Sequence, residues 1–279
     1  MTGDHVIAVV GLQDDWQAKV KRLFVLPLML FNVGFVVLGI VTGWWGVVVA
    51  AMAQFVLFGM IATKRTRHVG ASPALVIGAA GLIWASTDSV GAAVFAALAS
   101  VLLLIYVFWY SYSQRTPSVA LTIGSPFPVV DFADIDGNVV TSTSWSGTPT
   151  VLLFYRGTWC PMCNVQVREL SEGYRDIESL GAQVILVSPR PAEESAKLAR
   201  QFDAPMTFLV DDGNAAARAL GIQHPGGAPL GIVPEGESVL PTAVVLDRDG
   251  VIRFAHETDN YRFRPDPALF LDALRGLAA

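Results

Sequence analysis

The chain has 279 residues, of which 53% are hydrophobic and 15% are charged, with a net charge of −5. Soluble domains usually carry about 25% charged residues, so the composition excludes an ordinary soluble protein throughout. Seven Lys and Arg against four Asp and Glu give residues 1–115 a net charge of +3, whereas twelve against twenty give residues 116–279 a net charge of −8. The negative half excludes nucleic acid as an expected partner.

The first element expected is a polar N-terminal segment, residues 1–22, followed by a membrane domain over residues 23–115. No charged residue occurs in the 41 positions from Leu23 to Thr63, and a bilayer core needs only about 20 apolar residues. Two helices fit there, with a break at residues 42–45, Thr-Gly-Trp-Trp. The stretches 71–87 and 89–114 are equally apolar. We therefore predict four transmembrane helices in the lipid bilayer, of which residues 71–87 form the shortest.

Basic residues predict the orientation of this membrane domain. They cluster before the first span, between the second and third spans (residues 64–67), and at Arg115 after the fourth. The positive-inside rule places all three clusters in the cytoplasm, which predicts a multi-pass protein of the cell membrane with a cytoplasmic C-terminal domain. If residues 71–87 do not cross, three segments span and that domain lies on the exoplasmic side. No charge inside a span marks an ion pathway, so we interpret this part as an anchor or as a docking module for a membrane protein partner.

Residues 116–123 are expected to form a linker, and residues 124–279 a second domain. Alternating apolar runs predict strands, and recurrence at helical spacing predicts the helices between them. Asp-Gly turns at residues 136–137 and 249–250 predict a hairpin at each end of the domain. This order predicts an α/β sandwich with a mixed central sheet. The strands expected are 128–132, 138–141, 150–156, 182–188, 206–210, 242–246 and 251–256; the helices are 192–202, 215–220, 266–277 and one from Pro161 that ends before Gly181.

Cys160 and Cys163 are the chain's only cysteines. Three roles are compared for them: ligands of a metal, a structural disulfide and a redox-active dithiol. A structural zinc site usually needs four ligands, and the four histidines show no paired spacing, so we predict no metal and no cofactor. A structural disulfide between these two residues would close a very short loop and constrain little chain entropy. These considerations favour a redox-active dithiol.

The dithiol is predicted to lie between the strand 150–156 and the helix that follows. Pro161 suits the first helical position because it lacks an N–H group, and the positive end of the helix lowers the pKa of a thiol beside it. Cys163 lies four residues before Val167 on the apolar face, so it is the more buried sulfur. We therefore expect Cys160 to attack and Cys163 to resolve. Arg156 either adds positive potential or is solvated; Trp159 either shields the site, contacts a partner or packs in the core.

The run Val151-Leu-Leu-Phe-Tyr-Arg-Gly-Thr-Trp-Cys-Pro-Met-Cys163, with Val210-Asp-Asp-Gly213 and Leu240-Pro-Thr-Ala-Val-Val-Leu-Asp-Arg-Asp-Gly250 after it, resembles the thioredoxin fold. More narrowly, it resembles peroxiredoxin-like members of the alkyl hydroperoxide reductase and thiol-specific antioxidant superfamily. The resemblance covers residues 124–277, and no family is recognised for the four-span region. It implies a thioredoxin-like domain in which Pro241 is a cis-proline facing the cysteines, beside which substrate binds in extended form.

One departure from that family concerns the hydroxyl residue that helps to orient peroxide. The family's Pro-x-x-x-Thr/Ser-x-x-Cys pattern falls here on Leu153 and Gly157, and the neighbouring Thr158 is interpreted as a helix cap. His224, His256, Tyr261 and Arg264 are interpreted as solvated surface residues, although the segment 256–264 resembles the family's tail.

Three functions follow as alternatives. The favoured one is a membrane-anchored thiol-disulfide oxidoreductase that acts on a protein or small-molecule disulfide and exchanges electrons with a thiol system. The second is a thiol-dependent peroxidase. The third is a non-catalytic redoxin-fold subunit that binds within, or helps to assemble, a membrane complex.

Overall fold

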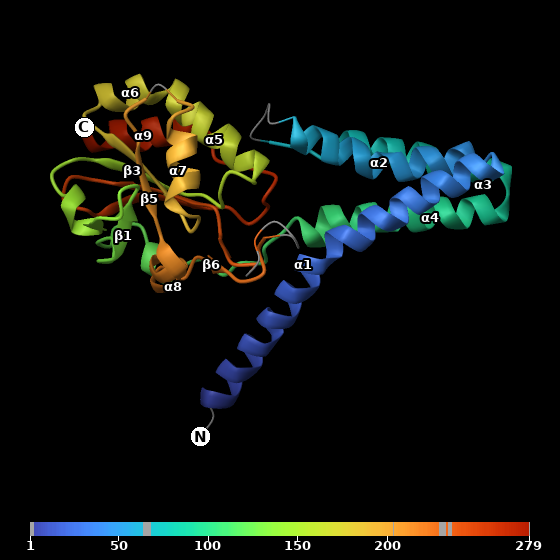
Figure 1. Cartoon of the computed structure of the whole chain (residues 1–279), viewed down its shortest axis with the longest axis horizontal. Coiled ribbons are helices and arrows are strands. Elements are labelled where there is room, and N and C mark those ends of the chain that lie inside the picture. Colours follow the sequence, from blue (N-terminus) through green and yellow to red (C-terminus); the bar gives the residue numbers. More distant parts are fainter. Residues whose placement is uncertain (1–2, 64–67, 203, 229–232, 234–235, 279) are drawn as a thin grey trace. The chain divides into compact units, whose positions relative to one another are not determined.

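The computed structural model describes residues 3–63, 68–202, 204–228, 233 and 236–278, and the chain divides into two compact units. The first unit consists mainly of the residues up to Ser113, and the second mainly of the residues after it (Figure 1). Each unit is described separately below.

The N-terminal unit is helical. It contains α1 (Gly3–Thr42), α2 (Trp45–Ala62), α3 (Ser72–Asp88) and α4 (Val90–Ile105), and a π-helical turn, Tyr106–Tyr110, continues α4. The predicted break at residues 42–45 is confirmed, because Gly43 separates α1 from α2 with φ +75°, a conformation that favours glycine. Ser89 begins α4, since its side-chain oxygen accepts a hydrogen bond from Ala92 N at 3.0 Å. The N-terminal segment expected to be separate belongs to α1.

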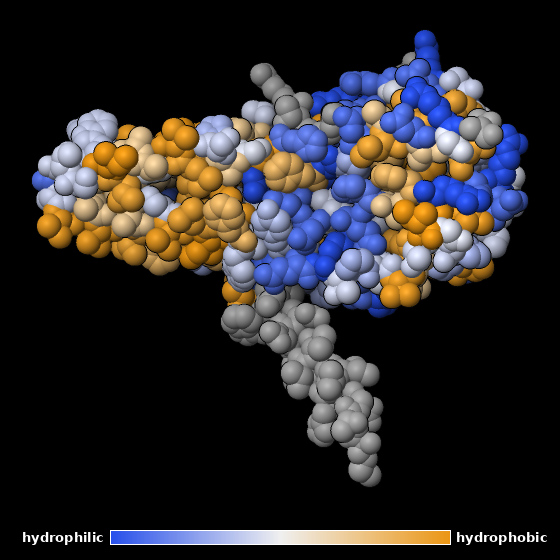
Figure 2. Space-filling view, turned by 180° about the vertical axis from the view of Figure 1, so that it is seen from behind, coloured by the Kyte–Doolittle hydropathy of each residue, from blue (hydrophilic) through white to orange (hydrophobic). Residues whose placement is uncertain are grey.

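Three segments of this unit are long and apolar enough to cross a membrane: Lys19–Thr42, Trp45–Ala62 and Val90–Tyr110. Apolar side chains cover the helical unit on the face seen in Figure 2, and Val41 and Ile83 are 79% and 69% exposed. Helix α3, the shortest predicted span, has 17 residues, so its crossing stays a prediction. The basic residues 64–67 lie outside the described residues.

Helix α3 packs closely against α2 at two glycines. A Cβ atom on Gly46 would lie 2.3 Å from Ala85 N, and one on Gly81 would lie 2.3 Å from Ala50 N. Such distances are too short for any side chain, so glycine at both positions allows the two backbones to approach, as is common in helix pairs within lipid.

The C-terminal unit is built on a seven-stranded mixed sheet. Strands β3 (Thr150–Phe154), β4 (Gln183–Ser188) and β5 (Thr207–Val210) are parallel, whereas β8 (Thr242–Leu246) and β9 (Ile252–Glu257) run antiparallel to their neighbours. Strands β1 (Asp131–Asp134) and β2 (Val139–Thr141) complete the order β2-β1-β5-β4-β3-β8-β9. The predicted mixed sheet is confirmed. A separate two-stranded sheet, β6 (Gln223–His224) and β7 (Ser238–Val239), was not predicted.

Helices cover the sheet. The single helix predicted after Pro161 is two helices, α5 (Pro161–Glu172) and α6 (Tyr174–Ser179), separated at Gly173. Helix α6 contacts β4, and α9 (Pro267–Ala278) contacts β8 and β9. The remaining helices are α7 (Ala192–Ala199), α8 (Ala215–Ala219) and the 3₁₀ turns Val119–Leu121, Ser142–Trp145 and Asp212–Asn214. Alternate strand residues such as Leu152 and Phe154 pack with Trp145 and Leu220 in one buried core, which fixes β3 at the centre of the domain.

Candidate active site

The loop after β3 carries the cysteine pair to the edge of the sheet. All five residues of β3 are buried, and Tyr155 N still donates to Val187 O of β4 at 2.9 Å. The chain then turns at Gly157, whose φ of +123° lies in the region that favours glycine. Cys160 N donates to Gly157 O at 3.2 Å and closes this turn. Cys160 therefore lies beyond the carboxyl end of β3, at the end of a short loop over residues 155–159.

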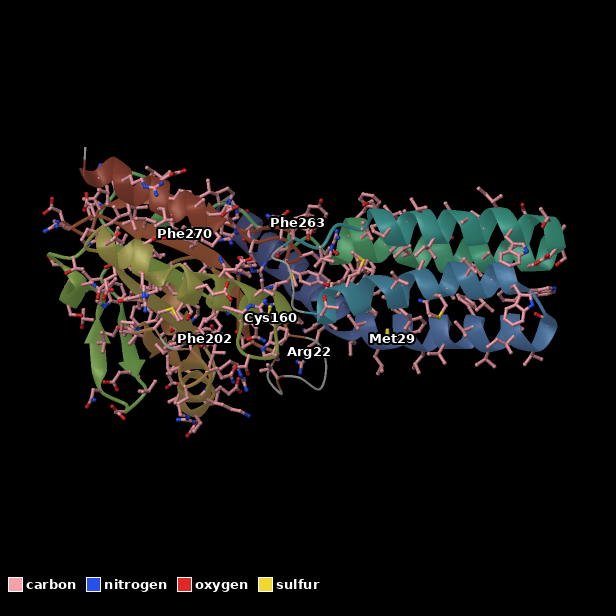
Figure 3. The ribbon with its side chains drawn as sticks, turned by 90° about the horizontal axis from the view of Figure 1, so that it is seen from above. Arg22, Met29, Cys160, Phe202, Phe263 and Phe270 are labelled. Carbon is pink, nitrogen blue, oxygen red and sulfur yellow. The ribbon has the colours of Figure 1, made fainter. Side chains whose placement is uncertain are left out.

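Cys160 is the N-cap residue of α5, and Pro161 occupies the first turn (Figure 3). The backbone N–H groups of Cys163 and Asn164 donate to Cys160 O at 3.1 and 3.2 Å. The predicted position of both residues at the strand-to-helix junction is confirmed. The Cys160 sulfur accordingly lies in the positive field of the helix N-terminus.

The two sulfurs are close together. Both cysteines are free thiols, and Cys163 Sγ donates to Cys160 Sγ at 2.8 Å. Cys163 is fully buried and Cys160 is 2% exposed, in agreement with the predicted order of burial. The pair is therefore arranged for direct sulfur-to-sulfur chemistry.

Two buried arginines surround the sulfurs. Arg264 Nη2 lies 3.8 Å from Cys160 Sγ and 3.7 Å from Cys163 Sγ, and its Nη1 donates to the carbonyls of Tyr261 and Phe263 at 2.8 Å. Arg156 stands over the Trp159 ring at 4.6 Å and directs Nε to Ser238 Oγ at 3.4 Å. Arg264 is 1% exposed, so its interpretation as a solvated surface residue is wrong.

These surroundings separate the pKa values of the two thiols. Burial raises the pKa of Cys160, but the hydrogen bond from Cys163 and the charges of Arg264 and Arg156 outweigh it and lower that pKa to about 5. Burial, together with the bond it donates to Cys160, raises the pKa of Cys163 well above its ordinary value. A free cysteine has a pKa of about 8.5, so near neutral pH Cys160 is the thiolate and Cys163 the thiol.

Thr158 and Trp159 have structural contacts that the sequence did not indicate. Thr158 does not cap α5, since the cap residue is Cys160 and no side chain caps it. Instead Thr158 Oγ1 donates to Glu194 Oε2 of α7 at 3.1 Å, and the same carboxylate binds Arg190. Trp159 is half-buried, and the cation-π contact with Arg156 is its clearest role. Both residues therefore shape the loop before Cys160.

Pro241 lies at the same edge of the sheet, because β8 pairs with β3 through Thr242 and Phe154. The described residues contain no cis peptide bond, so the expectation of a cis-proline is wrong. The trans form is the intrinsically favoured one. The backbone on both sides of this bond is held by hydrogen bonds, since Leu240 N donates to Ile222 O at 2.7 Å and Thr258 N donates to Pro241 O at 3.1 Å.

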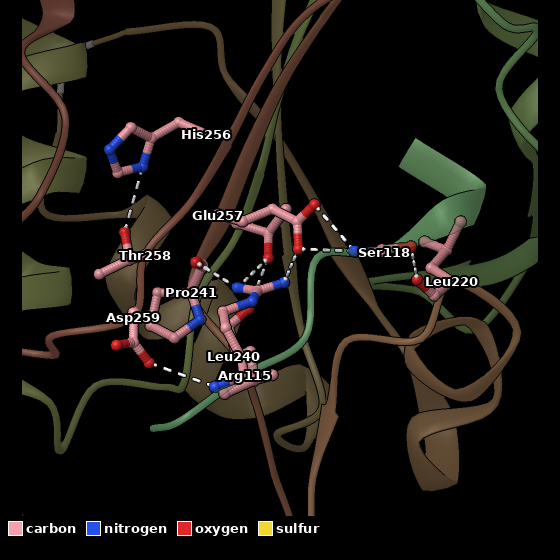
Figure 4. Close-up of polar contacts among 10 residues, drawn as sticks. Arg115, Ser118, Leu220, Leu240, Pro241, His256, Glu257, Thr258 and Asp259 are labelled. Carbon is pink, nitrogen blue, oxygen red and sulfur yellow. Dashed lines mark hydrogen bonds and ion pairs between the residues drawn. The ribbon is translucent and has the colours of Figure 1, made fainter. Parts of the chain in front are cut away.

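Arg115, the last residue of the expected membrane domain, and Ser118 of the expected linker are attached to this edge (Figure 4). Arg115 forms an ion pair with Glu257 and directs Nη1 to Pro241 O at 3.4 Å and to Thr242 Oγ1 at 3.2 Å. Ser118 N donates to both carboxylate oxygens of Glu257 at 3.1 Å. The Arg115 side chain is 3% exposed, so this segment is part of the packed domain.

Strand β3, the cysteine pair at the start of the next helix and the mixed sheet define a redox domain of the thioredoxin fold, peroxiredoxin-like in character. Residues 123–255 match the AhpC/TSA family. The chain belongs to this family through its C-terminal unit, and family membership indicates redox enzyme activity.

Named relatives are similar over a little more than half of the chain. Peroxiredoxin Q, chloroplastic, of Sedum lineare is 27% identical over 168 residues, which are 57% of this chain and 84% of that protein. The protein of the same name from Gentiana triflora is 30% identical over 158 residues, 56% of this chain and 67% of that protein. Against a rice peroxiredoxin Q the chain spans 61% of the relative's length. The crystal structure of peroxidoxin BcpB from Mycobacterium tuberculosis is 21% identical with a TM-score of 0.47, covering 57% of this chain and 99% of that one.

Of the predicted site residues, the structure brings Cys160, Cys163, Arg156 and Trp159 together. Arg264 was missed because it is 101 residues from Cys163 and lies in a segment without strand or helix periodicity. The only signal for it was the resemblance of residues 256–264 to the family's tail.

Proposed function

We propose that the C-terminal domain is a thiol-disulfide oxidoreductase in which Cys160 attacks and Cys163 resolves. The observation that carries the proposal is the 2.8 Å separation of the two sulfurs at the first turn of α5, with Cys163 donating to Cys160. This arrangement supplies an ionised nucleophile, Cys160. It also places a second thiol, Cys163, beside the sulfur that it has to attack. A dithiol exchanger needs both.

Written in the reductive direction, the reaction has two exchanges. The Cys160 thiolate attacks one sulfur of a substrate disulfide, the substrate S–S bond breaks, and the leaving thiolate takes a proton. Cys163 then loses its proton and attacks Cys160 Sγ in the mixed disulfide, which releases the second substrate thiol. The chain ends as the Cys160–Cys163 disulfide and has passed two electrons to the substrate. An electron-donating thiol system completes the cycle by reducing that disulfide.

We also propose that the apolar helices anchor this domain to the lipid bilayer. The three long apolar segments support this, because their exposed side chains suit lipid better than water. A membrane anchor restricts the substrates to disulfides that reach the membrane surface, those of membrane protein partners included.

A peroxidase is the second candidate, and membership of the AhpC/TSA family favours it. In that reaction the Cys160 thiolate attacks a peroxide oxygen, the O–O bond breaks, and the alcohol or water leaves with a proton. The resulting sulfenic acid condenses with Cys163 and releases water. Gly157 counts against this candidate because it stands where the family has its hydroxyl residue.

The test compares the full-length chain with its Cys160→Ser and Cys163→Ser variants in a disulfide-reductase assay. We expect Cys160→Ser to lose activity, since the nucleophile is gone, and Cys163→Ser to lose turnover while accumulating a mixed disulfide at Cys160. Full reductase activity in Cys160→Ser would remove the assignment.

The two candidates differ in their response to peroxide. Mass spectrometry of the reduced chain after limiting hydrogen peroxide should show slow and incomplete oxidation of Cys160 if disulfide exchange is the function. Rapid, stoichiometric formation of the Cys160–Cys163 disulfide would favour the peroxidase instead.

A further inference from the structure

Arg156 and Arg264 are the two arginines beside the dithiol, and both are buried, at 7% and 1% exposure. Four other arginines form ion pairs with carboxylates in the described parts of the chain: Arg115, Arg190, Arg253 and Arg275. Within those same parts, neither Arg156 nor Arg264 forms such a pair. Their contacts are a hydroxyl, an aromatic ring, two carbonyls and the sulfurs, and Arg264 Nε is buried without a hydrogen-bond partner among the described residues.

A buried cation without an anion is strongly unfavourable. The group in contact that can supply a negative charge is the Cys160 thiolate, which is bonded to the Cys163 thiol. A Cys160–Cys163 disulfide is neutral, so oxidation removes that anion while both guanidinium groups stay charged.

We propose that the Cys160–Cys163 couple is oxidising, because the buried guanidinium groups of Arg156 and Arg264 stabilise the reduced, thiolate form and lose their anion when the disulfide forms. The inference rests on the proposed function and makes oxidation of substrate dithiols, the reverse of the reductive cycle written above, the favoured direction. The disulfide form of the chain is a disulfide donor to substrate dithiols.

The donating step balances as follows. A substrate thiolate attacks Cys160 Sγ of the protein disulfide, the S–S bond breaks, and Cys163 leaves and takes a proton. The second substrate thiol loses its proton and attacks the substrate sulfur of the mixed disulfide, and Cys160 leaves as the thiolate beside Arg264. Two electrons pass from the substrate dithiol to the chain. A low-molecular-weight disulfide, such as glutathione disulfide, reoxidises the chain by the reverse exchange.

The direction follows from the leaving group. A thiol with a low pKa leaves faster from a mixed disulfide, and the pKa of Cys160 is about 5, below the ordinary thiol value of about 8.5 expected for a substrate thiol. In a mixed disulfide with a substrate dithiol, Cys160 is therefore expelled and the substrate keeps the new disulfide.

Other titratable and charged groups surround this cluster. Tyr155 has its pKa raised to about 12, chiefly by burial, so it stays neutral. Burial lowers the pKa of His256 of β9, and the charges of Arg264 and Arg115 also lower it. On α7 and the loop before it, Glu194 and Arg190 neutralise each other. Cys160, whose pKa is about 5, is already ionised above pH 6, so reduction of the disulfide there releases one proton.

The experiment equilibrates the full-length chain in detergent with reduced and oxidised glutathione and measures the reduced fraction by alkylation and mass spectrometry. Arg264→Gln should lower the equilibrium constant for reduction at pH 7 by about tenfold or more. For a two-electron couple, a tenfold change corresponds to a reduction potential lower by about 30 mV. Arg264→Lys keeps the charge and should retain most of the constant. Arg275→Gln, a surface variant on α9, should leave it unchanged.

The wild-type chain gives a second measurement that needs no variant. Reduction by two glutathione molecules yields the Cys160 thiolate, the Cys163 thiol and one free proton, so the constant should rise about tenfold per pH unit between pH 6 and 8. His256→Gln should keep this slope. A constant that does not change with pH, or an Arg264→Gln variant that matches wild type, would overturn the inference.

These outcomes are separate from the test of the proposed function. If the chain forms no Cys160–Cys163 disulfide with glutathione disulfide, and Cys163→Ser traps no mixed disulfide, the oxidoreductase proposal fails as well. If exchange is normal but the constant is independent of Arg264 and of pH, only the oxidising direction fails.

Discussion

Gly157 decides how the loop before Cys160 is built. Its φ is +123°, and a Cβ atom there would lie 2.6 Å from Arg190 Cγ and 3.1 Å from Trp159 Nε1. Arg190 is held by its ion pair with Glu194, so it has little freedom to move aside. The family's hydroxyl residue is therefore excluded here by backbone conformation as well as by sequence.

Restoring that hydroxyl should not create an efficient peroxidase. We expect Gly157→Thr to destabilise the domain by about 1–3 kcal/mol, because a side chain is strained at this φ and also clashes. Thermal denaturation of the full chain measures the loss, and peroxide consumption measures the activity.

Gly137→Ala is the matched control, because Gly137 also has a positive φ but has open space around its Cβ position. Gly137→Ala should be less destabilising than Gly157→Ala. It places a side chain at a positive φ without a clash, whereas Gly157→Ala places one at a positive φ and also causes a clash. Equal costs, or a Gly157→Thr variant that consumes peroxide rapidly, would contradict this explanation.

At the scale of elements, the segment after the last apolar helix is attached to the end of β8 and β9. Arg115 and Glu257 have side chains that are 3% and 15% exposed, and their ion pair lies beside the Pro241 carbonyl. Removing one member of a largely buried pair leaves the other uncompensated. This attachment should therefore hold the edge of the sheet that carries Pro241.

Arg115→Met should destabilise this edge by about 2–4 kcal/mol. Amide hydrogen exchange of β8 and β9 in the full-length chain, followed by mass spectrometry, should show faster exchange than in wild type. Arg253→Met removes an ion pair whose arginine is 48% exposed and should cost less than about 1 kcal/mol. The same exchange rates in both variants would contradict the role given to Arg115.

The sequence predicted the elements that rest on local patterns. The apolar run of β3, the proline at the start of α5 and the glycine between α1 and α2 each specify local structure, and each lies where expected. The break at Gly173 was not predicted, because the apolar spacing of residues 167–177 continues through it. The helix divides at Gly173, which has non-helical dihedrals of φ −89° and ψ 6°, and glycine is unfavourable inside a helix.

The site was predictable only in its contiguous part. Cys160, Pro161 and Cys163 occur together in the chain, whereas Arg264 and Glu194 reach the same loop from distant segments. Thr158 was predicted to cap a helix because it precedes α5, but its hydroxyl donates to the Glu194 carboxylate of α7. These contacts join segments that are distant in the sequence, so a short motif cannot predict them.

At the scale of the whole molecule, the packing of α3 against α2 predicts how often the chain crosses the membrane. Helix α3 has 17 residues and α2 has 18, and the two run close together along the contacts at Gly46 and Gly81. A helix packed along a spanning helix of nearly equal length covers the same thickness of lipid. We therefore predict four crossings, with both ends of the chain in the cytoplasm.

Cysteine labelling tests this prediction in a Cys160→Ser, Cys163→Ser background. A membrane-impermeant maleimide should label Thr42→Cys in intact cells, because the α1–α2 turn faces outward. It should label Gly276→Cys, at an exposed position of α9, only after the cells are permeabilised. Labelling of Gly276→Cys in intact cells would indicate three crossings and an exoplasmic redox domain.

The most direct test of the central claim, that Cys160 is the ionised nucleophile of the pair, is the pH dependence of its alkylation. The reduced full-length chain is treated with iodoacetamide from pH 4 to 9, and the modification of each cysteine is followed by mass spectrometry. The lowered pKa predicts that Cys160 reacts first, with a half-maximal rate near pH 5, while Cys163 stays unmodified at neutral pH. Preferential reaction of Cys163, or a midpoint for Cys160 near the ordinary thiol value of about 8.5, would contradict the account.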